Sequence, residues 1–125
     1  SVFYMDSYIK MWKNYFNFQD RTTRKDYWMS VLINFLIGIV LGFLSGLFTN
    51  FPIIGKLNIM DLISYIYFIL ILIPGLAQSV RRMHDVNKSG WYLLMSLIPI
   101  VGWIIVLVQE CSPSVDVNNN YGTKL

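Results

Sequence analysis

The residues best suited to chemistry are concentrated in one short polar segment, Val80 to Trp91, which reads VRRMHDVNKSGW. Cationic side chains in this segment could hold a phosphate through charge-assisted hydrogen bonds. Catalysis is disfavoured, because His84 has no Ser or Cys nucleophile with a matching partner, and a metal ion needs more ligands than one histidine. The segment therefore predicts an anion-binding site with no catalytic residue, no metal and no cofactor.

A second basic group, in the N-terminal segment, could complete this site if both lie at the same membrane face. The candidate residues for an anionic lipid or a lipid-linked phosphate are Arg21, Arg24, Lys25, Arg81, Arg82, His84 and Lys88. A purely structural alternative stays open. In it, Asp85 or Ser89 caps the following helix and Asp85 pairs with an arginine, which fixes the loop.

The elements that position these residues are three long runs without charge. They contain 29 residues between Asp26 and Lys56, 19 between Asp61 and Arg81, and 21 between Lys88 and Glu110. About 20 apolar residues suffice to cross a bilayer, and a domain this small has too little core to hide three such helices from water. The sequence predicts an all-α integral membrane bundle, one domain over 1–125, with spanning helices at 28–50, 60–80 and 90–109 and a polar tail at 110–125.

The orientation follows from the basic residues, which concentrate on the cytoplasmic side of spanning segments. Eight of them fall in the N-terminal segment or in the loop between the second and third runs, whereas Lys56 and Lys124 fall on the other side. We therefore expect a cytoplasmic N-terminus and, after three crossings, an external tail with Cys111 at or beyond the outer interface. Pro99 and Gly102 leave open a re-entrant third segment that would return the tail to the cytoplasm.

Residues 3–18 are predicted to form an amphipathic helix ahead of the first span. One half of its helical wheel is strongly aromatic, and the other carries polar and charged side chains, with Asp6 and Lys10 spaced to pair. Such a helix should lie in the headgroup plane. Docking on a cytoplasmic partner protein is the alternative.

The predicted spans contain regularly spaced glycines and two prolines. Gly38, Gly42 and Gly46 form a stripe on which another helix can pack closely, and we expect the partner to be another span of the same chain, with oligomerisation as the alternative. Pro74 and Pro99 predict kinks. Broken spans are also used by transporters, but none of the three runs contains an ionisable residue of the kind a coupled carrier needs.

Several motifs resemble a bacterial inner-membrane family known as domain of unknown function 805. These are the segments KNYFNFQDRTTRKDYW at 13–28, Ile73 to Trp91, and LIPIVGW at 97–103. Asp20 stands where the family usually has glycine, and the tail lacks the usual prolines. The positions that match the family's pattern are Tyr15, Phe18, Arg21, Arg24, Tyr27, Trp28, Arg82, His84, Asp85, Ser89, Gly90 and Trp91.

These observations predict a small, non-enzymatic, multi-pass protein of the bacterial cytoplasmic membrane. The first hypothesis is a basic cytoplasmic-face site for anionic lipid, with Tyr27, Trp28, Asp85, Ser89, Gly90 and Trp91 as its structural motif. The alternatives are a regulatory, immunity or assembly subunit that docks a larger membrane protein, and a small transporter. The expected partners are membrane lipids, a membrane protein or a second copy of the chain, and no nucleic acid, because the basic residues line a membrane face.

Overall fold

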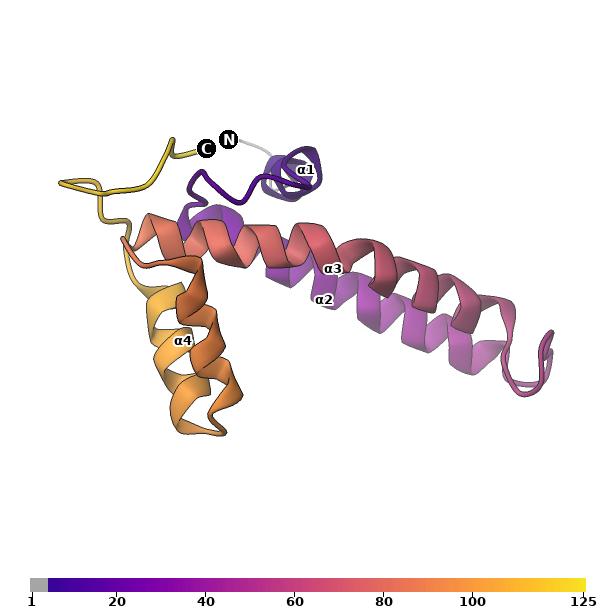
Figure 1. Cartoon of the computed structure of the whole chain (residues 1–125). Helices are drawn as coiled ribbons and strands as arrows, with labels where there is room; N and C mark the ends of the chain where they lie inside the picture. The colour runs from indigo at the N-terminus through magenta and orange to yellow at the C-terminus, as the bar shows by residue number, and fades with distance from the viewer. Residues whose placement is uncertain (1–4) are drawn as a thin grey trace. The chain divides into compact units, whose positions relative to one another are not determined.

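The computed structural model describes residues 5–125, and the described chain is helical: α1 (Met5–Lys13), α2 (Arg24–Leu47), α3 (Ile59–Asp85), the 3-10 helix η1 (Gly90–Leu97) and α4 (Val101–Cys111) (Figure 1). The chain divides into two compact units. The terminal unit contains the residues up to Ser30 and from Ile73 onward, and the middle unit is Val31–Leu72. Helices α2 and α3 each contribute to both units.

Helices α2 and α3 are long and apolar enough to cross a bilayer. Only 11% and 6% of their most apolar windows are buried inside the protein, so their hydrophobic side chains are not the core of a soluble fold. The predicted spans at 28–50 and 60–80 therefore correspond to real helices, and α3 continues through Pro74. The start of α3 is capped reciprocally, since Asn58 Oδ1 accepts from the N–H of Asp61, and Asp61 Oδ2 accepts from the N–H of Asn58.

Polar side chains join the two helices within the middle unit. The Ser45 hydroxyl donates to Asp61, and the Asn58 amide donates to the carbonyl oxygen of Ser45 at 3.0 Å. Further along, the Tyr67 hydroxyl donates to Asn34. Because these bonds have few competitors in an apolar unit, they fix the register of α2 against α3.

The glycine stripe is open in the described chain. A Cβ atom built at Gly38, Gly42 or Gly46 meets no atom within 4 Å, and Gly42 and Gly46 are exposed. The α3 helix therefore does not pack closely on this stripe within the middle unit, whereas packing by the third apolar run stays a prediction. Within the middle unit, Asn34 and Ser45 of α2 make the hydrogen bonds to α3 instead.

The third apolar run is not one helix, so the prediction of a single helix over 90–109 is wrong. The chain breaks between η1 and α4, where Ile100 has φ 65° and ψ −66°, and the two short helices lie side by side (Figure 1). A Cβ atom on Gly102 would lie 1.6 Å from the carbonyl oxygen of Met95, so only glycine permits this close approach. With rises of about 2.0 Å and 1.5 Å per residue, each arm is about 16 Å long, roughly half of a 30 Å hydrocarbon layer.

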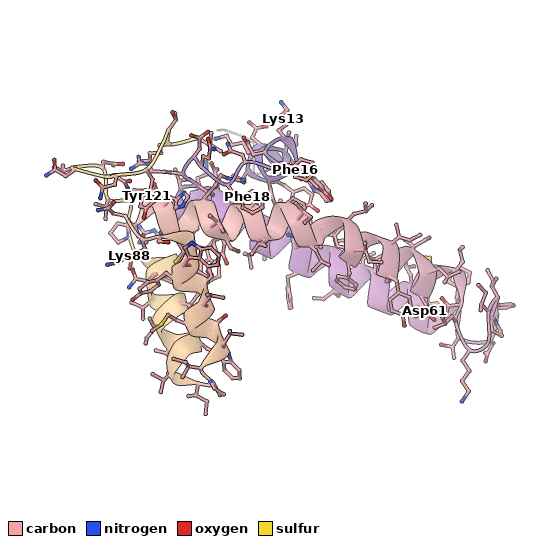
Figure 2. All side chains as sticks on the ribbon, viewed as in Figure 1. Lys13, Phe16, Phe18, Asp61, Lys88 and Tyr121 are labelled. Atoms are coloured by element: carbon pink, nitrogen blue, oxygen red, sulfur yellow. The ribbon has the colours of Figure 1, made fainter. Side chains whose placement is uncertain are left out.

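Helix α1 is shorter than the predicted 3–18 helix, of which residues 3 and 4 lie outside the described chain. It ends at Lys13, and the Asn14 side chain then donates to the carbonyl oxygen of Lys10 at 2.8 Å. The helix contacts the first turn of α2 through Ser7, which is buried and donates to Asp26 at 2.6 Å, and Lys10 pairs with the same carboxylate at 3.1 Å. Tyr8 is buried, whereas Phe16 beyond the helix is 75% exposed (Figure 2).

Candidate functional site

Two arginines in the terminal unit lie beside one buried carboxylate, and a third arginine binds the neighbouring loop. We call Arg21, Arg81, Arg82 and Asp85 the arginine clasp; all four are buried. Arg82 donates to Asp85 Oδ2 at 2.7 Å, and Arg21 Nε lies 3.7 Å from Asp85 Oδ1. Since a buried charge is tolerated only when it is paired, Asp85 supplies the anion for these two guanidinium groups.

Arg82 also binds the end of α4. Its Nε donates to the carbonyl oxygen of Glu110 at 3.0 Å, and its Nη2 donates to the carbonyl oxygen of Ser112. The last carbonyl groups of a helix lack partners within the helix and carry partial negative charge. The Trp28 indole donates to Glu110 O at 2.9 Å and Arg24 to Cys111 O at 3.1 Å, so three side chains complete the C-terminal end of α4.

Arg81 holds the loop between α1 and α2. Its Nη1 donates to the carbonyl oxygens of Asn14 and Asn17 at 2.9 Å and 2.8 Å, and its Nε donates to the Thr22 hydroxyl at 2.8 Å. The N–H of Thr22 returns a bond to the carbonyl oxygen of Arg81 at 3.1 Å. The loop therefore folds onto the end of α3, with the guanidinium group as its centre.

Arg21 connects the N-terminal segment to the tail. It donates to Val115 O and to Asp116 Oδ1, both at 2.9 Å, and this contact, with a further one from Lys124, lowers the pKa of Asp116. The Arg21 N–H also donates to Thr123 O at 2.9 Å. The predicted separation of the tail from the N-terminal segment is therefore wrong, because the two segments are hydrogen-bonded to each other.

The tail is seated against the loop before α2 and against His84. Asp20 Oδ1 accepts from the N–H of Thr123 at 3.0 Å, and the pKa of Asp20 is lowered by hydrogen bonds from Asn17 and from Thr123. The Tyr121 ring stacks on the imidazole of His84, with ring centroids 4.2 Å apart and planes 3° from parallel.

The tautomer of His84 follows from its neighbours. Its Nδ1 lies 3.2 Å from Gln19 O and 3.1 Å from Asp20 O, and since carbonyl oxygens only accept, Nδ1 carries a proton. In the neutral ring Nε2 is then an acceptor. Among residues 5–125 no group of three or more His, Cys, Asp or Glu side chains could hold a metal ion.

The motif residues have distinct structural roles. Ser89 caps η1 by accepting from the N–H of Trp91 at 3.1 Å. Gly90 permits η1 to approach α3, because a Cβ there would lie 2.8 Å from Val80 Cγ1. Trp91 is 79% exposed, whereas Tyr27 is buried. The Ser89 cap and the Asp85–Arg82 pair are both features of the structural alternative that the sequence left open.

The structure divides the predicted anion-binding set. Arg21, Arg81 and Arg82 are buried among protein acceptors, and His84 is 7% exposed. Arg24, Lys25 and Lys88 are exposed, and the Lys88 ammonium lies 5.9 Å from the centre of the Tyr92 ring (Figure 2). Sequence reasoning missed the groups in the tail and the first loop that complete the site, namely Asp20, Ser114, Asp116, Asn119 and Tyr121.

A cavity of about 470 Å³ lies between η1 and the second half of α3. Its walls are mainly apolar, with His84 and Ser89 as the polar exceptions. This size and character are typical of small-ligand sites. The lining residues are Phe18, Leu76, Val80, His84, Ser89, Gly90, Trp91, Leu93 and Leu94.

Comparison with known proteins shows which family this sequence matches. Residues 15–123 match the family described as "Protein of unknown function (DUF805)". The chain belongs to this family. It is 37% identical over 118 residues to the "Inner membrane protein YhaH" of Escherichia coli K12, with 94% of each chain covered. It is 33% identical over 118 residues to the "Inner membrane protein YhaI" of the same strain, which covers 94% of this chain and 93% of the relative. No solved structure matches.

The matched region includes every residue of the arginine clasp, the Ser89–Gly90–Trp91 motif and the tail up to Thr123. The family match therefore extends over the whole terminal unit except its first fourteen and last two residues.

Proposed function

We propose that this DUF805 protein is a non-enzymatic protein of the bacterial inner membrane that crosses the bilayer twice, through α2 and α3. The hairpin of η1 and α4 enters only the cytoplasmic leaflet, and both ends of the chain lie in the cytoplasm. The observation that carries this proposal is the backbone pairing of the tail with Arg21, which supports a location of the tail on the same side as the segment before α2. The inner-membrane names of YhaH and YhaI support the location.

The distribution of charge supports the same topology. The chain has ten lysines and arginines. With the tail inside, Lys124 joins the eight cytoplasmic residues, which gives nine, and Lys56 alone remains outside. Two crossings thus give nine basic residues inside and one outside, whereas three crossings give eight inside and two outside. The two-crossing topology therefore agrees better with the retention of lysine and arginine on the cytoplasmic side. The arms of the hairpin, each about 16 Å long, suit a single leaflet.

The biochemical role that we propose is binding of anionic lipid at the cytoplasmic surface. Exposed cations there include Arg24, Lys25 and Lys88, and each basic residue near an anionic membrane surface contributes about 1 kcal/mol of attraction. The buried arginines support the fold in this account, because their hydrogen bonds go to protein atoms. The lipid-binding set is thus narrower than the seven residues expected from the sequence.

Thermal unfolding in neutral detergent tests the lipid-binding role. Added phosphatidylglycerol should raise the melting temperature more than phosphatidylcholine, because a ligand that binds only the folded state stabilises it. Combined Lys25→Gln and Lys88→Gln substitutions should reduce this gain, whereas Lys56→Gln, which removes a charge from the opposite side, should leave it unchanged. Equal gains from both lipids in the wild-type protein would refute the role.

A protein-interaction role is the second candidate, and the open glycine stripe favours it. Gly42 and Gly46 are exposed and leave a surface on which a helix of another membrane protein can pack. Crosslinking in intact cells from Phe43→Cys in a Cys111→Ser background tests this role. Recovery of a discrete protein adduct that Gly42→Leu abolishes would support it, and recovery of lipid adducts alone would exclude it.

A further inference from the structure

The cavity between α3 and η1 has apolar walls and two polar lining residues, the buried His84 and the exposed Ser89. His84 is 7% exposed, and its Nδ1 is engaged by the carbonyl oxygens of Gln19 and Asp20. Its other ring nitrogen, Nε2, has no hydrogen-bond partner among the described residues. In the tautomer that Nδ1 requires, Nε2 is an acceptor without a donor.

Ser89 supplies the complementary group. Its oxygen accepts the capping bond from the N–H of Trp91, so the hydroxyl hydrogen remains to be donated. The site therefore offers one acceptor and one donor at the border of an apolar cavity. A hydroxyl group, which both donates and accepts, satisfies this pair with a single atom.

The apolar walls of the cavity indicate what kind of molecule would carry that hydroxyl group. Leu76, Leu93 and Leu94 line the cavity and contribute only hydrocarbon, and the exposed ring of Trp91 borders it. Gly90 keeps the two walls close together without a side chain between them. An alkyl chain would be buried along these leucines, with a gain of roughly 25 cal/mol for each Å² of apolar surface removed from water.

We propose that this cavity binds a long-chain lipid with a free, uncharged hydroxyl as its head group, held between His84 Nε2 and the Ser89 hydroxyl. The inference rests on the proposed insertion of the hairpin into the cytoplasmic leaflet, from which the lipid would enter. It does not depend on the anionic-lipid role, because the ligand is uncharged and the cavity contains no lysine or arginine.

Photolabelling of the full chain in neutral detergent tests this site. The probes are a long-chain alcohol with a diazirine at the far end of its chain, and its methyl ether, which can accept a hydrogen bond but cannot donate one. The alcohol should label peptides that contain Leu76, Leu93 or Leu94. It should bind roughly threefold to tenfold more tightly than the ether, the value of one neutral hydrogen bond.

Two variants separate the polar contact from the apolar wall. In His84→Asn the amide nitrogen stands in for Nδ1 and can still donate to Gln19 O and Asp20 O, but the acceptor at Nε2 is lost. This variant should bind alcohol and ether equally. Leu76→Trp fills the cavity and should abolish labelling by both probes, whereas the control Ile104→Trp, on an exposed face of α4 outside the cavity, should label normally.

The outcomes are decisive in both directions. Equal binding of alcohol and ether by the wild-type protein, or labelling that survives Leu76→Trp, would overturn the proposal. Alcohol-selective labelling that His84→Asn removes would support it even if phosphatidylglycerol and phosphatidylcholine stabilise the protein equally. Failure of the anionic-lipid role and failure of this site are therefore distinguishable.

Discussion

Replacement of Arg82 by glutamine should strongly destabilise the terminal unit. The side chain is fully buried, pairs with Asp85 at 2.7 Å, and donates to the carbonyl oxygens of Glu110 and Ser112. Removing one partner of a buried ion pair costs about 3–5 kcal/mol, because the other charge is left uncompensated. A typical domain has only about 5–15 kcal/mol of stability, so the loss is a large fraction of the total.

Thermal unfolding in detergent measures this loss of stability. At roughly 4 °C per kcal/mol for a chain of this size, the melting temperature should fall by about 12–20 °C. Arg24→Gln is the matched control, since Arg24 also donates to a carbonyl oxygen at the end of α4 but is exposed. Its loss should cost no more than about 1 kcal/mol.

Anionic lipid distinguishes the clasp from a phosphate site. If Arg82 holds Asp85 and the α4 carbonyls, the loss of stability should be the same with and without phosphatidylglycerol. The reasoning would be refuted if Arg82→Gln melted like the wild-type protein without lipid and failed only to gain stability when phosphatidylglycerol was added. In that case Arg82 would serve a ligand instead of the fold.

Two further predictions concern the hairpin and the tail. Gly102→Ala should disrupt the hairpin, because its Cβ would collide with Met95 O, whereas Gly42→Ala, which meets nothing within 4 Å, should leave the melting temperature of the monomer nearly unchanged; equal effects would show that the close approach is not needed. Since the pKa of Asp20 is lowered in the folded protein, its stabilisation is present above the unfolded pKa of about 3.9 and is lost as the pH falls through the folded pKa. The melting difference between wild type and Asp20→Asn should therefore be largest near neutral pH and shrink in acid; a difference that is constant with pH would contradict this assignment.

The two long apolar helices α2 and α3 could be predicted from the sequence because a charge-free run of this length is what a membrane-spanning helix requires. The third run passes the same length test, yet Ile100 and Gly102 turn it back on itself. Pro99 in the sequence indicates a break in the helix. A proline is equally compatible with a kink in a spanning helix and with the turn of a re-entrant hairpin, so the sequence does not distinguish the two.

Part of the site could be predicted from the sequence, but most partners of its arginines could not. Asp85 with Arg82, and Ser89 as a cap, followed from residue types and close spacing. The carbonyl oxygens that engage Arg81 and the tail residues that engage Arg21 did not, because every residue has a carbonyl and the contacts join segments more than 60 residues apart. The sequence therefore shows that arginines are concentrated in two segments. It does not show whether their guanidinium groups bind a ligand or backbone carbonyl groups of the same chain.

The accessibility of Cys111, the only cysteine, distinguishes two membrane crossings from three, because this residue is exposed at the end of α4. A membrane-impermeant maleimide should label Cys111 in inside-out vesicles and not in intact spheroplasts, because two crossings and a re-entrant hairpin leave it at the cytoplasmic face. Lys56→Cys in a Cys111→Ser background should show the reverse pattern. Efficient labelling of Cys111 in intact spheroplasts, with none in inside-out vesicles, would mean that the third segment crosses the membrane and would contradict the account.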